Sequence, residues 1–199
     1  LEPKPHATLE QPERSRTMKA VVWTGQLEVR NDVEVRDLRA NEVRVRIHAA
    51  GLCHSDVSVV NGTIPFPTPA VLGHEGAGVV EAVGEGVTDL RPGDRVAYGS
   101  SPLGSYSEVR CLPAGVLHKL PEALDFETGA AMMLKGLTAA YLLLHAYPVR
   151  SGDAILIHAA AGGVGLIACQ WAKALGATVI GTVSTEAKAE LARRHGCDH

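Results

Sequence analysis

Short stretches in which apolar and polar residues alternate fill residues 19–121, and this is the pattern of half-buried β-strands. In the stretch 43–48, aliphatic residues alternate with arginine and histidine, so Val43, Val45 and Ile47 are predicted to face a core. Turn-forming glycine, asparagine and proline separate this strand from its neighbours. Further strands are predicted over 20–23, 33–36, 78–83, 95–98 and 106–111. The first half of the chain is therefore predicted to be all-β.

After residue 121 the apolar positions take up helical spacing. Asp125 is a residue type that caps helices, and it precedes a predicted helix that begins near Phe126. The run 137–146 is rich in alanine and leucine and ends before Pro148. This run predicts a second helix with an apolar face.

The C-terminal part alternates continuous apolar runs with helical patterns. The run 153–157 is almost entirely apolar, which is typical of a strand buried on both faces. It is followed by a helix over 163–175, a strand over 178–182 and a helix that Thr185 can cap and that runs to about 195, with Gly176 and Gly196 closing the two helices. Strand, helix, strand and helix in this order predict a parallel βαβ unit.

The composition limits the class of protein. The 199 residues are 46% hydrophobic and 21% charged, which is typical of a soluble globular chain with a core. The net charge is −3, so nothing in the charge favours nucleic acid or an anionic membrane as a partner. The four cysteines are widely spaced and form no CxxC pair, which indicates reduced thiols and predicts a cytoplasmic location.

Two segments bear on targeting and membranes. Residues 154–172 are uncharged and long enough to cross a bilayer, but three glycines together with His158 and Gln170 favour a buried strand, a turn and a helix. No membrane span is predicted. Residues 1–17 are polar and contain proline without an apolar stretch, so they predict a disordered leader and not a signal peptide.

The segment 160–165, Ala-Ala-Gly-Gly-Val-Gly, lies between the predicted buried strand and its helix. A dinucleotide-binding turn needs glycine where the backbone approaches the pyrophosphate and where the helix packs on the strand, and the helix N-terminus supplies N–H groups. Ala160 stands where the first of these glycines would be. A glycine-rich turn without a ligand is the alternative, but the flanking strands and helix favour a cofactor site. The candidate cofactor-binding residues are Gly162, Gly163, Val164 and Gly165.

The end of the second strand of this unit selects between the two nicotinamide cofactors. An Asp or Glu there binds the ribose hydroxyls of NAD and repels a 2′-phosphate. The segment 181–185, Gly-Thr-Val-Ser-Thr, holds no acid, whereas Ser184 can donate a hydrogen bond and Lys188 can contribute positive charge to a phosphate. The pattern favours NADPH over NADH, the alternative being that Lys188 is a solvated helix residue.

Two segments of the all-β half hold metal-ligating residue types, Cys-His-Ser-Asp at 53–56 and Gly-His-Glu at 73–75. Cysteine, histidine and carboxylate side chains are the ligands of catalytic zinc, which keeps one position open for water or substrate. Cys53, His74 and Glu75 are therefore candidate ligands. The alternative is that Cys53 is a small buried thiol and His74 a hydrogen-bonded core residue, since no spacing rule links the two segments.

The order of an all-β half, CHSD, GHE and AAGGVG resembles the medium-chain dehydrogenase/reductase superfamily, which joins a GroES-like domain to a Rossmann domain. Residues 18–97, with AAGLCHSDVSVVNG and VLGHEGAGVVEAVG, are similar to zinc-dependent alcohol dehydrogenases. Residues 98–199, with MLKGLTAAYLLL and HAAAGGVGLIACQWAKALGATVIGTVSTEAKAEL, are similar to zinc-free NADPH:quinone oxidoreductases related to zeta-crystallin. The resemblance implies an α/β fold: a GroES-like β domain at 18–122, then an incomplete Rossmann-type parallel βαβα domain at 123–199.

The alcohol dehydrogenase pattern implies roles for the residues of the CHSD and GHE segments. Cys53 and His74 would be two ligands of a catalytic zinc. Ser55 would be the first member of a proton relay, and His54 would face the cofactor pyrophosphate. The resemblance therefore makes Ser55 and His54 candidate catalytic residues.

The same pattern assigns a helical threonine to the nicotinamide, and that position corresponds to Thr138. The family's third zinc ligand is a cysteine four residues before this threonine, where the chain has Leu134. Leucine cannot bind a metal, so the zinc site is one ligand short unless Glu75 substitutes. The quinone reductase pattern is also altered, because CHSD stands where those enzymes carry an Asn-Pro-x-Asp type sequence.

The predicted function is that of an NADPH-dependent oxidoreductase that transfers hydride between the nicotinamide and a quinone or carbonyl compound. Alcohol oxidation needs a Lewis acid to stabilise an alkoxide, whereas a quinone needs only positioning and a proton donor such as Ser55 or water. One alternative is a zinc-dependent alcohol dehydrogenase acting on an alcohol or aldehyde. The other is a catalytically inactive truncated or chimeric fragment that binds only the adenosine end of a nucleotide. A homodimer or homotetramer is expected for the complete protein.

Overall fold

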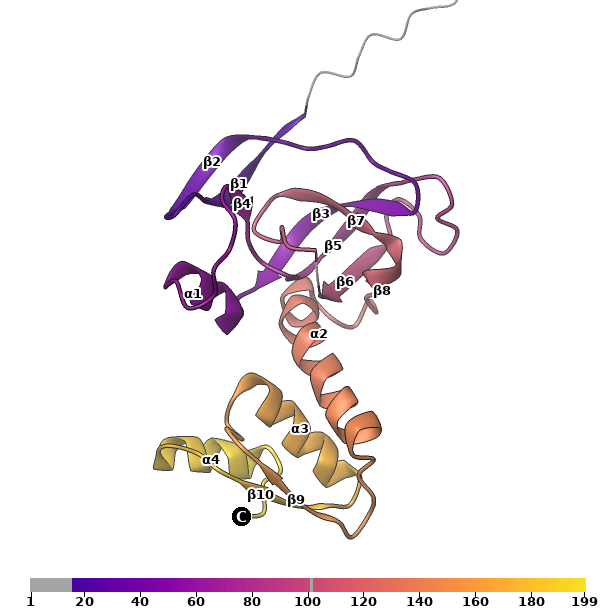
Figure 1. The fold of residues 1–199 in the computed structure, drawn as a ribbon. Coiled ribbons are helices and arrows are strands. Elements are labelled where there is room, and N and C mark those ends of the chain that lie inside the picture. Colours follow the sequence, from indigo (N-terminus) through magenta and orange to yellow (C-terminus); the bar gives the residue numbers. More distant parts are fainter. Residues whose placement is uncertain (1–15, 101) are drawn as a thin grey trace, which may run out of the picture.

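The structure is a computed structural model that describes residues 16–100 and 102–199. A β region comes first in the chain and a smaller βα unit last, with one long helix between them (Figure 1). The β region consists of β1 (Thr17–Trp23), β2 (Leu27–Glu34), β3 (Glu42–Gly51), α1 (His54–Val60), β4 (Ala70–Val71), β5 (Glu75–Val83), β6 (Arg95–Gly99), β7 (Val109–Pro113), the 3₁₀ turn η1 (Ala114–Val116) and β8 (His118–Lys119). The rest consists of α2 (Phe126–Ala140), the π-helical turn η2 (Tyr141–Ala146), β9 (Ala154–Ile157), α3 (Gly163–Ala174), β10 (Thr178–Gly181) and α4 (Glu186–Arg194).

Two antiparallel sheets build the β region. The larger has the order β7-β3-β5-β6-β8 and the smaller the order β2-β1-β4. Val43 and Val45 of β3 are fully buried, whereas Arg46 and His48 of the same strand are exposed. The alternation predicted for this strand is therefore confirmed, and it sets which face of the larger sheet carries the core.

The βα unit has the predicted parallel pairing, with Ala154 of β9 opposite Thr178 of β10 and Ile157 opposite Gly181. The predicted burial of β9 on both faces is wrong, because Leu156 is 57% exposed. Among the described residues β9 pairs only with β10. One edge of the strand is therefore unpaired within the described part of the chain. Its face with Leu156 is open, whereas Ile155 and Ile157 pack against the core to which α3 contributes.

Helix ends follow the capping residues that the sequence indicated. The Asp125 carboxylate accepts a hydrogen bond from the Thr128 N–H at 2.7 Å, and the Thr185 hydroxyl accepts one from the Lys188 N–H at 3.3 Å. The glycines that follow α3 and α4, Gly176 and Gly196, have φ angles of +88° and +99°. The expected start of the first helix and both predicted glycine stops are thus confirmed.

The two helices predicted between residues 126 and 146 are in fact one. Helix α2 continues without a break into η2, since neither proline nor a capping residue interrupts it and Gly136 is tolerated within a helix. Helix α1 was not predicted, because its seven residues are too few to show a periodic pattern and its N-cap is Cys53. Residues 154–172 form the strand, turn and helix that were predicted for them.

Helix α2 packs on β3, β5 and β6 of the larger sheet and also on α3. It reaches the sheet closely because Gly99 at the end of β6 has no side chain. A Cβ there would lie 2.7 Å from the Leu134 Cα and would also overlap the Leu134 backbone nitrogen. By length and composition alone, residues 126–146 could also span a membrane. Their contacts with the sheet and with α3 are those of a helix that packs within a folded domain.

The first described residues are tied to the sheet by a carboxylate with three arginine neighbours. Glu81 of β5 lies 2.9 Å from the Arg16 guanidinium, 2.5 Å from that of Arg46 and 3.6 Å from that of Arg44. Two residues of the predicted disordered leader, Arg16 and Thr17, are therefore part of the folded β region, and for them the prediction is wrong. The remainder of that prediction, residues 1–15, lies outside the described residues.

Glu81→Gln is expected to lower stability by about 1 kcal/mol at pH 7 and by progressively less in acid. Partial burial acts to raise the pKa of Glu81, but the Arg16 hydrogen bond and the three arginine charges outweigh it and hold the pKa below the ordinary 4.5. A lowered carboxylate pKa contributes stability above the pKa of the unfolded chain and loses it as the pH falls. Thermal unfolding of wild type and variant from pH 7 to pH 3 measures the difference. Glu122→Gln, at an exposed position, is the control, and a difference that does not shrink below pH 4.5 would contradict the assignment.

Candidate active site and cofactor site

Three metal-ligating side chains meet where β3 ends and β5 begins. Gly51, the last residue of β3, pairs with Glu75, the first residue of β5, and α1 starts two residues after Leu52. This geometry brings the Cys53 sulfur, a ring nitrogen of His74 and a carboxylate oxygen of Glu75 within 4.8 Å of one another. The structure thus places the three candidate ligands in one cluster, although they come from two separate segments.

Asp56 holds the backbone of this cluster in place. Its carboxylate accepts hydrogen bonds from the Cys53 N–H at 3.3 Å, the Gly73 N–H at 3.2 Å and the Tyr106 hydroxyl at 2.8 Å. The Asp56 Oδ1 also lies 3.6 Å from the His74 Nδ1. Burial, followed by the Asp56 hydrogen bond, raises the pKa of Tyr106, so the phenol stays protonated and donates. Sequence reasoning missed Tyr106, which carries no motif and lies 50 residues from Asp56.

The two candidate catalytic residues of α1 lie differently with respect to this cluster. The Ser55 hydroxyl is 3.4 Å from the His74 Nε2, so it is in contact with the cluster. His54, the first residue of α1, is exposed and is not among the three clustered donors. Ser55 and His74 can therefore exchange a proton along one hydrogen bond.

Lys135 of α2 joins the cluster from the other side. Its ammonium lies 2.6 Å from the Glu75 Oε2, and the Glu75 side chain is completely buried whereas that of Lys135 is 26% exposed. The aliphatic stem of Lys135 lies over Gly163, since a Cβ on that glycine would be 3.0 Å from the Lys135 Cδ. One side chain thus contacts both the donor cluster and the glycine-rich turn. Sequence reasoning missed it because the partners are 60 residues apart.

Leu134 and Thr138 of α2 complete the surroundings. The Leu134 backbone is the part of α2 that rests on Gly99, and its side chain offers no metal ligand. The Thr138 hydroxyl donates to the Leu134 carbonyl at 2.8 Å. Its oxygen lone pairs are therefore what Thr138 can offer to another group.

These residues do not fit a catalytic zinc ion as they stand. Such an ion needs three protein ligands, and the chain offers a thiol, an imidazole and the Glu75 carboxylate. The carboxylate is already bound to the Lys135 ammonium at 2.6 Å, and a dication at the same oxygen would be repelled by that charge. Cys53 and His74 alone would leave the ion with too few protein ligands.

The glycine-rich turn has the geometry of an anion-binding helix start. Gly162 is the N-cap of α3, and no side chain caps this end of the helix. Gly165 fits where nothing larger would, because a Cβ there would lie 2.5 Å from the Ala159 carbonyl oxygen and 2.7 Å from that of Ala160. The first-turn N–H groups of α3 are consequently available to a phosphate.

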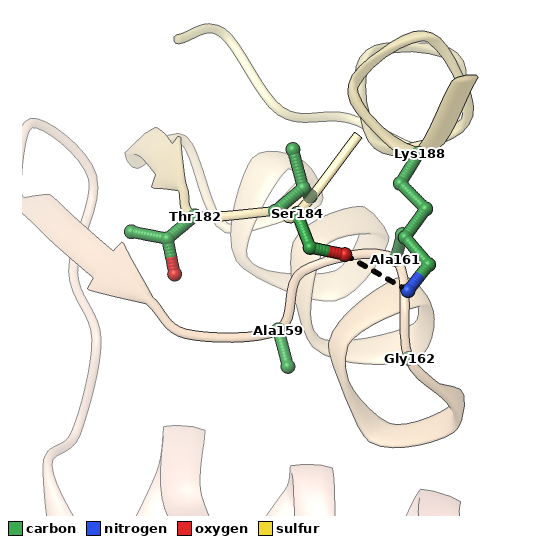
Figure 2. A pocket seen from close by; sticks show the side chains of 7 residues that line it. Ala159, Ala161, Gly162, Thr182, Ser184 and Lys188 are labelled. Atoms are coloured by element: carbon green, nitrogen blue, oxygen red, sulfur yellow. Dashed lines mark hydrogen bonds between the residues drawn. The ribbon is translucent and has the colours of Figure 1, made fainter. Parts of the chain in front are cut away.

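A pocket of about 330 Å³ opens between this turn and the end of β10. Figure 2 shows the Ser184 and Lys188 side chains turned toward each other at its rim, and the ammonium donates to the hydroxyl at 3.1 Å. The residues that line it include no aspartate or glutamate. They are Ala159, Ala161, Gly162, Thr182, Val183, Ser184 and Lys188.

A second, larger hollow of about 680 Å³ follows the open side of β9. Its wall is mainly aliphatic and comes from η2, β9 and the first turns of α3. Gly162, which lines the small pocket, also lines this hollow. The glycine-rich turn is therefore shared by the two hollows.

Two parts of the chain match models of known protein families. Residues 39–122 match the family model of the alcohol dehydrogenase GroES-like domain, and residues 163–199 match that of zinc-binding dehydrogenases. A quinone oxidoreductase of Pseudomonas aeruginosa is 58% identical over 156 residues, which are 78% of this chain and 48% of the relative. The chain belongs to the medium-chain dehydrogenase/reductase superfamily. Within the superfamily, its fold is the expected α/β one, a GroES-like sheet followed by Rossmann-like parallel strands.

Other members of the superfamily are similar to this chain in sequence and in fold. A 2-haloacrylate reductase of a Burkholderia species is 50% identical over 175 residues, covering 84% of this chain and 52% of the relative. A crystal structure of Escherichia coli quinone oxidoreductase complexed with NADPH superposes with a TM-score of 0.83 at 44% identity, covering 92% of this chain and 57% of that one. The chain spans about half the length of the curated relatives it matches. The similarity to quinone oxidoreductases also extends beyond residues 98–199, to which the sequence assigned it.

Proposed function

We propose that the protein reduces quinones or similarly activated carbonyl compounds with NADPH and does so without a metal at the reacting centre. The observation that carries the cofactor choice is the Ser184–Lys188 pair at the rim of an acid-free pocket beside the glycine-rich turn. The similarity to quinone oxidoreductases, one of them a complex with NADPH, supports the substrate class. Bound NADPH would supply the hydride, and one further proton completes the conversion of a quinone into a hydroquinone.

The residues of the βα unit would hold the adenosine half of the cofactor. The N–H groups of Gly163, Val164 and Gly165 at the start of α3 would bind the pyrophosphate, assisted by the partial positive charge of the helix N-terminus. The Lys188 ammonium and the Ser184 hydroxyl would bind the 2′-phosphate that distinguishes NADPH from NADH. An aspartate at the end of β10 would do the opposite, and none is present.

The residues around the donor cluster would serve the acceptor end. Ser55 can give a proton to a reduced quinone oxygen and recover one from the His74 ring, 3.4 Å away. The Asp56 carboxylate lies 3.6 Å from the Nδ1 of the same ring, on the side away from Ser55. Thr138 would accept a hydrogen bond on the nicotinamide side, because its own hydrogen is engaged by Leu134. His54, exposed at the start of α1, would contribute only through the cofactor phosphates.

We also propose a domain boundary at residue 122, a homodimeric or homotetrameric assembly and a cytoplasmic location. These three proposals rest on the sequence pattern and on the superfamily. Quinone, aldehyde and alcohol are the small-molecule substrates that the site chemistry allows, and the first is favoured because Lys135 occupies the carboxylate that a zinc ion would need.

Lys188→Ala is expected to raise the Kd for NADPH by about 10- to 100-fold and to leave the Kd for NADH nearly unchanged. The variant loses the charge that would face the 2′-phosphate, a group that NADH lacks. Binding is measured by the change in nicotinamide fluorescence, and the rate by NADPH oxidation with 1,4-benzoquinone in the presence of a chelator. Arg194→Ala removes a cation from the same helix outside the pocket and serves as the control.

The same measurements separate the proposal from its alternatives. Equal loss of NADH and NADPH binding in Lys188→Ala would contradict the cofactor assignment. NADPH binding without quinone-dependent oxidation would favour a nucleotide-binding fragment without catalytic activity. Alcohol oxidation that disappears on chelation would favour a zinc-dependent alcohol dehydrogenase.

A further inference from the structure

The Glu75 carboxylate is the buried charge that needs an explanation at the donor cluster. Its side chain is completely buried at the first residue of β5, and an isolated carboxylate in such a place is unstable. Oε2 is paired with the Lys135 ammonium at 2.6 Å. Oε1 has no hydrogen-bond partner among the described residues, so half of the carboxylate is still available to a cation.

The neighbours of Glu75 are of the kinds that bind transition metals. The Cys53 sulfur, a His74 ring nitrogen and a Glu75 oxygen lie within 4.8 Å of one another. In a tetrahedral zinc site the ligand atoms are about 3.5 Å apart, as follows from zinc–sulfur and zinc–nitrogen distances of about 2.3 and 2.0 Å. Small side-chain rotations would therefore close the cluster around an ion. The obstacle is the ammonium, not the geometry.

Lys135 is held where it blocks such an ion. Its backbone is fixed by the neighbouring contact between Leu134 and Gly99, and its stem lies against Gly163. The Lys135 side chain therefore reaches the cluster between two close backbone surfaces. Its single positive charge neutralises Glu75, and it repels a dication at either oxygen, because Oε1 and Oε2 belong to the same small carboxylate group.

We propose that the Lys135 ammonium is a built-in cation that takes the place of a metal at the Cys53–His74–Glu75 cluster. Removal of this charge converts the cluster into a divalent-metal site with thiolate, imidazole and carboxylate ligands. The assignment concerns the cluster itself and stands independently of whether the protein reduces quinones.

The test is a titration of the whole chain with Co²⁺, which replaces zinc in such sites and absorbs visibly when a thiolate binds it. Wild type, freed of metal by a chelator, is expected to show no thiolate-to-cobalt absorption at micromolar Co²⁺. Lys135→Met keeps an unbranched side chain, one atom shorter and without charge, and is expected to bind one equivalent of Co²⁺ at least 100-fold more tightly than wild type. The absorption should disappear in the double variant Lys135→Met/Cys53→Ser. Lys119→Met, which removes an exposed lysine from β8, should behave as wild type.

Two further variants separate the effect of the charge from an effect on folding. Lys135→Gln is uncharged and can still hydrogen-bond to Glu75, so it should fold where Lys135→Met does not, and it should also bind Co²⁺. Lys135→Arg keeps the charge and should not. Thiolate-bound cobalt in the wild type with the same affinity overturns the proposal. Far-UV circular dichroism shows which uncharged variants are folded. If none of the folded ones binds Co²⁺, the proposal is overturned as well.

Discussion

Gly165→Ala is expected to abolish measurable NADPH binding and to lower the free energy of unfolding by about 2–3 kcal/mol. The added methyl group would lie 2.5 Å from the Ala159 carbonyl oxygen and 2.7 Å from that of Ala160. Both atoms belong to the backbone, so no side-chain rotation relieves the overlap. Helix α3 must move away from the end of β9, and its N–H groups then no longer converge on the pyrophosphate site. Urea unfolding and NADPH fluorescence titration measure the two effects.

Gly136→Ala is the matched control for this substitution. A Cβ at Gly136 meets no described atom within 4 Å, and the residue lies in the middle of α2. The substitution should stabilise the protein by about 0.5–1 kcal/mol, since alanine favours a helix over glycine. NADPH binding by Gly165→Ala within twofold of wild type would show that the close approach of α3 to β9 is not required for the cofactor.

Gly99→Ala is expected to lower the free energy of unfolding by about 2–4 kcal/mol. The methyl would overlap the backbone nitrogen of Leu134 and lie 2.7 Å from its Cα. Helix α2 would have to shift away from β6, and this shift withdraws Lys135 from the buried Glu75. Urea unfolding measures the loss. Gly115→Ala, at a position in η1 where a Cβ meets no described atom within 4 Å, should change the midpoint little.

A Gly99→Ala midpoint equal to that of wild type would mean that α2 is not held by this contact. A double variant separates the causes of the loss. If Gly99→Ala combined with Glu75→Gln loses much less stability than the sum of the two single variants, part of the loss in Gly99→Ala comes from the unpaired Glu75 carboxylate.

Local features of the fold could be predicted from the sequence because neighbouring residues determine them. The alternation in 43–48 set the buried face of β3, Asp125 marked the start of α2, and the order of runs after residue 150 predicted the parallel pairing of β9 with β10. The open face of β9 could not be predicted in this way. A continuous apolar run looks the same whether one face or both are covered, and only the neighbouring elements distinguish them.

The candidate site could be predicted only in its motifs. Cys53, His74 and Glu75 could be named from their chemistry and Gly162 and Gly165 from their spacing. Lys135, which pairs with Glu75 at 2.6 Å, lies in the segment MLKGLTAAYLLL, which marks a family resemblance but contains no cysteine, histidine or carboxylate that would have linked it to the cluster. It meets Glu75 only because Gly99 lets helix α2 rest on the sheet, 60 residues away in the chain from the carboxylate. Tyr106 escaped prediction for the same reason.

The position of α2 also bears on how this protein could be recombined with its relatives. Along the chain the helix follows the β region, so a crossover at residue 122 looks natural. In space the helix packs against β3, β5 and β6, and at Gly99 the backbone of the strand directly contacts the backbone of the helix. A crossover at 122 would combine the sheet of one parent with the helix of another. The loop between η2 and β9 is the better junction, because a chimera joined there inherits sheet, helix and Lys135–Glu75 pair from a single parent.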